Sequence, residues 1–176
     1  MLSPFTEKEM VVRKEWREMT FRKETFMIYF HTWKCEDTGE EFEDKHFAQL
    51  NYDQVINQYR EKYNMPYPDD IKSIREKYDL SAIKMSHVLG FGDNTYRQYE
   101  AGEIPTQANA RLIQMAADPR KFLDMIDLSH TLEGSAIEKA RHNAERLIDK
   151  EDKEETVIRN YLFDGKQRSR FTGFGR

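Results

Sequence analysis

The chain has 176 residues, of which 34% are charged and 38% are hydrophobic, and it contains only eight glycines and five prolines. This composition excludes collagen-like and low-complexity proteins and fits one domain or two small ones with a large solvated surface. The formal net charge of −4 provides no overall positive field, so any contact with nucleic acid must be local.

Residues 8–42 are predicted to form a small antiparallel sheet. Their β-branched and aromatic side chains gather in short runs that are separated by charged triplets, which is typical of a meander. The runs cover residues 10–12, 19–21 and 25–33. Asp37, Thr38 and Gly39 then supply a turn.

From Asp44, apolar side chains recur at intervals of three to four positions. This period predicts a helix to about Tyr63. Pro66 and Pro68 follow it, and proline removes a backbone donor and favours extended geometry in the residue before it. We therefore expect a domain boundary at these prolines.

Residues 68–128 are predicted to form five short helices with short connectors. Ser81 is well placed as the N-cap of the second helix, and Gly90 permits a sharp turn after it. The next helix, residues 93–101, should end before Gly102, which tolerates left-handed geometry.

A further helix is predicted from the apolar periodicity of residues 134–160, followed by a basic, mobile tail at 166–176. The expected fold class is therefore α+β, with a small N-terminal antiparallel β domain, a five-helix domain and a C-terminal helical tail. The expected ranges are 1–43 for the β domain, 44–67 for a connecting helix and proline-containing linker, 68–128 for the five-helix domain and 129–176 for the helical extension and tail.

The helix at 93–101 has two kinds of side chain. Tyr96 and Tyr99 are expected to anchor it to the core, and Ser86 is expected to lie where the preceding helix comes close to it. The side chains left to point outward are Asp93, Asn94, Thr95, Arg97 and Gln98. A helix-turn-helix protein presents such a face to the major groove of DNA.

The spacing of Leu89-Gly90, Glu100-x-Gly102 and Pro105 resembles the Cro/C1-type (XRE) helix-turn-helix over residues 68–128. More narrowly, residues 3–128 are similar to the MqsA-type (YgiT-like) antitoxins, through the run from Gly92 to Gly102 and the β-plus-helix layout before it. The resemblance implies a zinc-binding β domain, a homodimer on operator DNA, autoregulation and a toxin protein as a partner.

The zinc-binding cysteines of that family are largely lost in this chain. Its two Cys-x-x-Cys pairs correspond here to Ser3-Pro4-Phe5-Thr6 and Cys35-Glu36-Asp37-Thr38. Because a hydroxyl is a poor zinc ligand beside a thiolate, we expect no metal and no other cofactor. An apolar core should hold the β domain instead, formed by Phe21, Phe26, Ile28, Phe30 and Trp33.

The resemblance also identifies the DNA-contacting positions. The base-contacting asparagine of the family corresponds to Asn94, and its partner arginine corresponds to Gln98, so adenine should replace guanine at that point of the operator. Lys84 and Arg97 are expected to face phosphates. Residues 70–127 contain eight basic and nine acidic side chains, so binding would depend on placement rather than on net charge.

Simpler interpretations stay open for these residues. Asn94 suits a helix cap, Gln98 suits a solvated surface, and Cys35 suits a half-buried thiol that is a relic of the lost ligand set. The leading hypothesis is a sequence-specific transcriptional regulator. The alternatives are an antitoxin whose β domain neutralises a toxin, and an interaction module that does not bind DNA.

The remaining indications concern compartment and catalysis. A single cysteine fits reducing cytoplasm, and no apolar run approaches the roughly 20 residues of a membrane span. No phosphate-binding loop, nucleophile motif or paired-histidine metal motif is present, so an enzyme is not expected.

Residues 160–163 and 171–174 resemble the linker before a SocA-like (Panacea) antitoxin domain.

Overall fold

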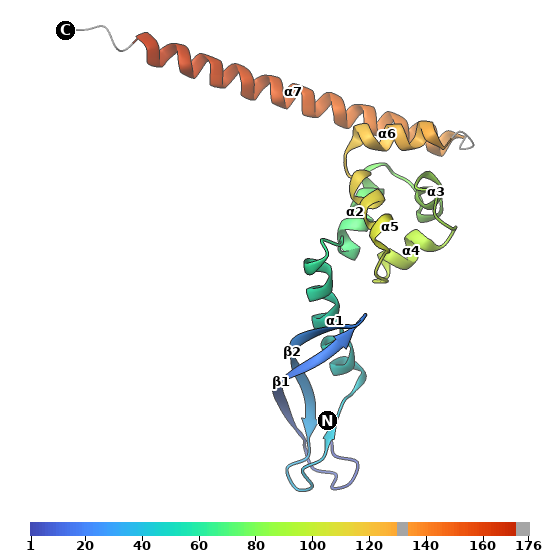
Figure 1. Ribbon diagram of the computed structural model, residues 1–176, viewed down its shortest axis with the longest axis vertical. Coiled ribbons are helices and arrows are strands. Elements are labelled where there is room, and N and C mark those ends of the chain that lie inside the picture. The colour runs from blue at the N-terminus through green and yellow to red at the C-terminus, as the bar shows by residue number, and fades with distance from the viewer. Residues whose placement is uncertain (130–133, 172–176) are drawn as a thin grey trace, which may run out of the picture. The chain divides into compact units, whose positions relative to one another are not determined.

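The computed structural model describes residues 1–129 and 134–171, with side chains to residue 162. In these residues a three-stranded antiparallel sheet is followed by seven helices (Figure 1). The α+β class predicted from the sequence is therefore confirmed. The chain divides into two compact units, Met1–Met65 and Pro66–Arg176, which are described separately below.

The sheet of the first unit is a long hairpin with a short third strand. Strands β1 (Val11–Phe21) and β2 (Glu24–Lys34) pair in antiparallel register, and β3 (Glu41–Phe42) pairs with the end of β2. The expected break in β1 at its charged triplet is wrong, since β1 is continuous from Val11 to Phe21. Its charged side chains are accommodated because β1 is an edge strand that is largely exposed.

Helix α1 (Lys45–Lys62) packs against one face of this hairpin. It begins at Asp44, whose side chain accepts a 2.8 Å hydrogen bond from the backbone N–H of Phe47. Most of the buried side chains between the helix and the hairpin are apolar: Phe26, Ile28 and Phe30 from β2, and Phe47, Val55, Ile56 and Tyr59 from α1. Helix α1 is thus part of the first unit, whereas the sequence predicts a connecting helix and linker at residues 44–67.

The amide side chains of α1 also cover the backbone of β2. Gln58 donates to the carbonyl of Met27 at 2.9 Å. Gln54 both accepts from and donates to the backbone of Tyr29, at 3.1 and 2.9 Å. These groups occupy the positions that another strand would fill, so α1 protects the sheet from pairing with a foreign strand.

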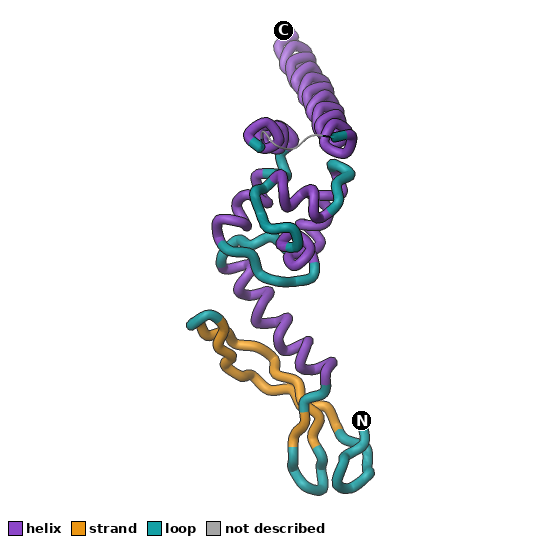
Figure 2. The backbone as a smooth tube through the Cα atoms, turned by 90° about the vertical axis from the view of Figure 1, so that its right-hand side faces the viewer, coloured by secondary structure: helices purple, strands orange, loops and turns teal. Residues whose placement is uncertain are grey.

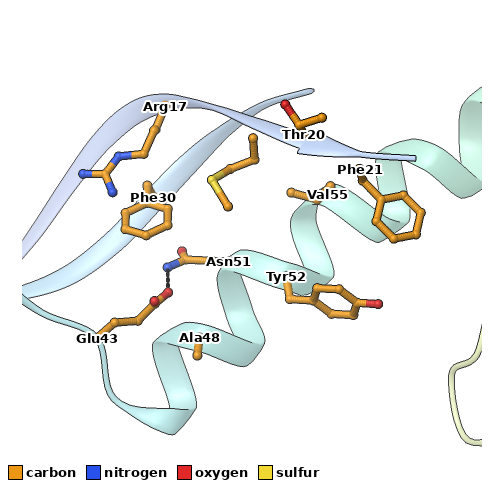
Figure 3. Close-up of a pocket in the computed structure, with 10 residues that line it drawn as sticks. Arg17, Thr20, Phe21, Phe30, Glu43, Ala48, Asn51, Tyr52 and Val55 are labelled. Atoms are coloured by element: carbon orange, nitrogen blue, oxygen red, sulfur yellow. Dashed lines mark hydrogen bonds between the residues drawn. The ribbon is translucent and has the colours of Figure 1, made fainter. Parts of the chain in front are cut away.

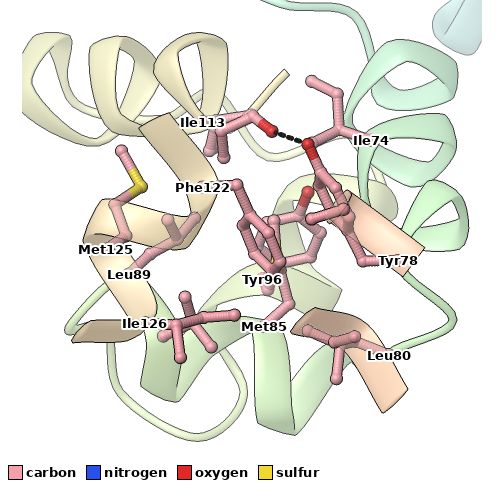
Figure 4. Close-up of a cluster of buried hydrophobic side chains, with 14 of the residues drawn as sticks. Ile74, Tyr78, Leu80, Met85, Leu89, Tyr96, Ile113, Phe122, Met125 and Ile126 are labelled. Carbon is pink, nitrogen blue, oxygen red and sulfur yellow. Dashed lines mark hydrogen bonds between the residues drawn. The ribbon is translucent and has the colours of Figure 1, made fainter. Parts of the chain in front are cut away.

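In its described residues the second unit contains six helices, which Figure 2 draws in purple. They are α2 (Pro68–Lys77), α3 (Ala82–Val88), α4 (Thr95–Glu100), α5 (Gln107–Met115), α6 (Pro119–Leu128) and α7 (Ser135–Phe171). Their core surrounds Tyr78, Tyr96 and Phe122, which are fully buried (Figure 4). The rings of Tyr78 and Phe122 stack with centroids 3.7 Å apart.

Helix α7 is longer than predicted. Its first turns pack against α6 through Ile137, Ala140 and Ala144, which are buried. The backbone stays helical to Phe171, so the expectation of a mobile tail is wrong for residues 166–171, where Lys, Gln and Arg are good helix formers. Residues 172–176 lie outside the described residues.

Candidate nucleic-acid interface

Ser86 lies between α3 and α4 and joins the two helices. It is fully buried, and its hydroxyl oxygen accepts a 3.1 Å hydrogen bond from the backbone N–H of Tyr96. Its carbonyl accepts a second bond, of 2.7 Å, from the N–H of Phe91 in the turn. The predicted role of a small side chain at this position is therefore confirmed. The hydroxyl also satisfies an N–H in the first turn of α4 that has no partner within the helix.

Two tyrosines fix α4 to the core, as the sequence predicts. Tyr96 is fully buried and its hydroxyl donates to the carbonyl of Ile71 at 2.7 Å. Tyr99 is buried, and its hydroxyl accepts a 2.8 Å bond from Asn109. Burial raises the pKa of Tyr96 above its ordinary value, so the phenol stays neutral. These contacts hold the inner face of α4 firmly in one orientation.

An ion pair between α2 and α4 was not predicted from the sequence. The Arg75 guanidinium donates to both carboxylate oxygens of Glu100, at 2.6 and 3.3 Å, and to the carbonyl of Leu80 at 2.9 Å. Both side chains are largely buried, and the carboxylate raises the pKa of Arg75. In the sequence, only Glu100 pointed to this ion pair, because it is one of the residues that carry the family resemblance.

Two glycines allow the chain to turn on either side of α4. Gly90 has a φ of +71° and Gly102 has a φ of +107°, conformations that L side chains rarely adopt. Ser81 caps α3 by accepting a 3.3 Å bond from the N–H of Lys84. The predictions made for these three positions are confirmed.

The outer surface of α4 presents two amides and a guanidinium. Asn94 occupies the N-cap position, but its side chain makes no capping hydrogen bond. Arg97 and Gln98 are exposed on the first turns. Within the described part of the chain, these three side chains have no hydrogen-bond or ion-pair partner. They are therefore free to bind an external ligand.

The other predicted contact residues are placed less favourably. The helix is shorter than the range 93–101, so Asp93 lies in the turn before it, where its carboxylate is 2.9 Å from the imidazole of His87. Thr95 is half-buried at the start of α4, and Lys84 is half-buried on α3. A carboxylate at the edge of the surface would repel phosphate, although it can accept a hydrogen bond from cytosine.

The four positions at which the family resemblance would place zinc ligands lie together. The hydroxyl of Thr6 is 3.6 Å from the Cys35 sulfur, and the hydroxyls of Ser3 and Thr38 also bond to this sulfur. Ser3 and Cys35 are buried. These bonds, that from Ser3 foremost, lower the pKa of Cys35 to about 6. These contacts connect the N-terminal loop to the loop after β2.

This cluster does not fit a zinc ion. Three hydroxyls and one thiol offer a single good ligand, whereas a structural zinc needs four from cysteine, histidine or carboxylates. Among the described residues, no group of three or more His, Cys, Asp or Glu side chains is placed to hold a metal ion. The hydrogen bonds from hydroxyl to sulfur connect the two loops directly.

A cavity of about 430 Å³ lies between the hairpin and α1 (Figure 3). Its charged groups already have partners: Arg17 lies 3.8 Å above the ring of Phe30 and 2.5 Å from Glu15, and Glu43 accepts a 2.7 Å bond from Asn51. The remaining lining is mostly apolar, with Tyr52 at its edge. The cavity therefore offers an apolar recess rather than a set of groups for acid–base chemistry.

Comparison of the chain with protein-family models and with curated proteins finds no match. The function is therefore inferred from the residues and the geometry described above. Of the helices in the described part of the chain, none is both long and apolar enough to cross a membrane.

Proposed function

We propose that this protein is a sequence-specific DNA-binding regulator that acts in the cytoplasm as a homodimer and resembles an antitoxin in controlling its own operator. In this proposal α4 enters the major groove, with Asn94 and Gln98 reading base edges and Arg97 contacting phosphate. The proposal is for a binding protein without metal or cofactor and without an enzymatic activity.

The observation that carries the proposal is the contrast between the two faces of α4. Its inner face is fixed by Tyr96 and Tyr99, while Asn94 and Gln98 on the outer face are exposed and unpaired in the described structure. Asparagine and glutamine amides pair bidentately with adenine in the major groove. A helix that presents such groups from a fixed backbone can discriminate bases, because little backbone order has to be gained on binding.

The charge of this unit favours specific over non-specific binding. Arg97 and Lys84 are the cations nearest the proposed contact surface in sequence, and Asp93 and Glu103 are exposed close to α4. Non-specific affinity comes almost entirely from cations at phosphates. We therefore expect weak binding to random DNA, and we expect base contacts to contribute more of the affinity for the operator than phosphate contacts do.

Fluorescence anisotropy with the DNA upstream of this gene tests the proposal. The wild-type protein should bind one fragment at low salt, and Asn94→Ala and Gln98→Ala should each weaken binding by about 1–3 kcal/mol while relaxing preference at one base pair. Gln49→Ala, which removes an exposed amide from the first unit, is the matched control and should bind normally.

Two outcomes would count against DNA binding. One is an absence of binding to every upstream fragment at low salt, which would leave an interaction module as the better description. The other is equal binding by the wild type and both α4 variants, which would show that a different surface contacts DNA.

A toxin protein is a second candidate partner, because the outer face of the hairpin carries a cluster of exposed apolar side chains. Trp16 on β1 and Tyr29 on β2 are directly paired in register, 58% and 47% exposed, and their rings lie 3.9 Å apart. Met27 is exposed on the same face. Exposed aromatic groups of this kind are enriched at protein interfaces. We propose this face for toxin binding, with any toxin encoded beside this gene as the partner.

A further inference from the structure

The C-terminal half of α7 extends past α6, and no other helix in the described part of the second unit lies beside it (Figure 1). Arg120 on α6 still contacts Glu151 and Asp152, but every residue from 151 to 162 is exposed. A helical segment that packs against nothing is only weakly stabilised in water, because most of the stability of protein helices comes from tertiary packing of one face.

Four large apolar side chains lie on one side of this exposed stretch. Val157, Ile158, Tyr161 and Leu162, here called the α7 patch, are 67%, 59%, 80% and 60% exposed. Their spacing places them on a single helix face. An exposed apolar patch on an otherwise charged helix marks a contact surface.

The α7 patch continues the face that the same helix buries in its own unit. Ile137, Ala144 and Ile158 are separated by multiples of seven residues, and so are Ala140, Leu147 and Tyr161. A seven-residue repeat is the pattern by which one helix packs along another, and here it is interrupted once, by Glu151 and Glu154. The first part of this face is covered by α6, and the second part is open.

The charges on either side of the α7 patch indicate what covers it. Residues 149–155 contain five acidic and two basic residues, and residues 164–170 contain three basic residues and one acidic residue. These segments lie at equal distances along α7 from the middle of the patch. A second α7 in antiparallel orientation would therefore bring acidic segment against basic segment at both ends, whereas a parallel one would bring like charges together.

We propose that the α7 patch is the surface through which two copies of this chain associate, as an antiparallel pair of α7 helices. The α7 patch would be the interface of the homodimer in the proposed function, and in that respect this inference rests on the proposed function. The pair would bury on the order of 1,000 Å², which is below a standard interface. We therefore expect a reversible dimer with a dissociation constant of roughly micromolar size.

Sedimentation equilibrium of the full chain without DNA tests this proposal. Ile158→Asp and Tyr161→Asp should each raise the dimer dissociation constant at least about 100-fold, because each removes an apolar group from both copies. Both positions are exposed, so far-UV circular dichroism should show an unchanged helix content. Leu128→Asp removes an exposed apolar side chain from α6 and is the matched control, which should dimerise normally.

A charge exchange tests the antiparallel orientation. Glu154→Lys with Glu155→Lys should weaken the dimer at least tenfold, as should Lys166→Glu with Arg168→Glu, and combining all four should restore it. The proposal would be overturned if the wild-type chain stayed monomeric at about 100 μM. It would also be overturned if Ile158→Asp and Tyr161→Asp left the dimer dissociation constant unchanged. Because no DNA is present, these results are independent of whether α4 binds an operator.

Discussion

Cys35 lies among three hydroxyls that favour its charged form. The hydrogen bonds from Ser3, Thr38 and Thr6 lower its pKa from an ordinary value of 9.0 to about 6. Between these two pH values the unfolded chain holds a proton that the folded chain has released. The stability that the cluster contributes should therefore be fully present above about pH 9 and should be lost as the pH falls towards about 6.

This prediction can be measured through the thiolate itself. Its absorbance near 240 nm should titrate with a midpoint close to 6 in the folded protein, and Ser3→Ala should move that midpoint upward by removing the foremost hydrogen bond. Chemical unfolding of the first unit at several pH values should show the matching trend, which Cys35→Ala should abolish. A midpoint near the ordinary thiol value would contradict the arrangement of the cluster.

Single residues with a local conformational role were predictable, and residues that act across the fold were not. Gly90 and Ser81 could be assigned because a turn and a helix start each require a particular residue type within a few positions. The pairing of Arg75 with Glu100 spans 25 positions, and either residue could equally have been an ordinary surface charge. The proximity of Ser3 and Cys35 likewise depends on two loops that meet only in the folded unit.

At the scale of elements, the hairpin depends on α1 for the protection of its β2 backbone. Asn51 is buried and makes three hydrogen bonds: it accepts from the N–H of His31 at 2.8 Å, and donates to the carbonyl of His31 at 3.0 Å and to Glu43 at 2.7 Å. Removing this amide would leave a backbone donor and acceptor of β2 without their partner, and each such loss costs about 1–3 kcal/mol.

Asn51→Ala should therefore destabilise the first unit by about 2–4 kcal/mol. Hydrogen exchange offers the sharpest measurement, because the amide of His31 should lose protection more strongly than its neighbours in β2. Gln49→Ala, on the exposed side of the same helix, should change little. Unaltered protection at His31 would show that the helix is not needed to cover the strand.

The periodicity of α1 predicted the element but not this role. Phe47, Val55 and Ile56 repeat at helical intervals and identify the buried face directly. Asn51, Gln54 and Gln58 lie between them at similar intervals, a polar stripe that sequence reasoning assigns to solvent. The continuity of β1 was missed for a related reason, since charges that end a strand in a buried sheet are accepted on an exposed edge.

At the scale of the whole molecule, the division into two units was predictable and the extent of α7 was not. Pro66 and Pro68 mark a boundary because proline disfavours continuation of a helix, and the structure divides the chain between Met65 and Pro66. The mixed charges after Ile148 hide the repeat that joins the two parts of α7. The proposed DNA-contacting surface and the proposed dimer surface lie on different helices of the second unit, so each can be altered without the other.

This separation gives a prediction for the assembled protein on DNA. A dimer that spans two half-sites about 34 Å apart gains affinity because the second α4 binds from an already tethered copy. Ile158→Asp should therefore reduce affinity for a two-half-site operator at least about tenfold, yet leave affinity for a single half-site unchanged. Gln98→Ala should weaken both. If Ile158→Asp weakened the single half-site equally, the patch would belong to the DNA-binding surface itself, and dimerisation through α7 would not account for operator recognition.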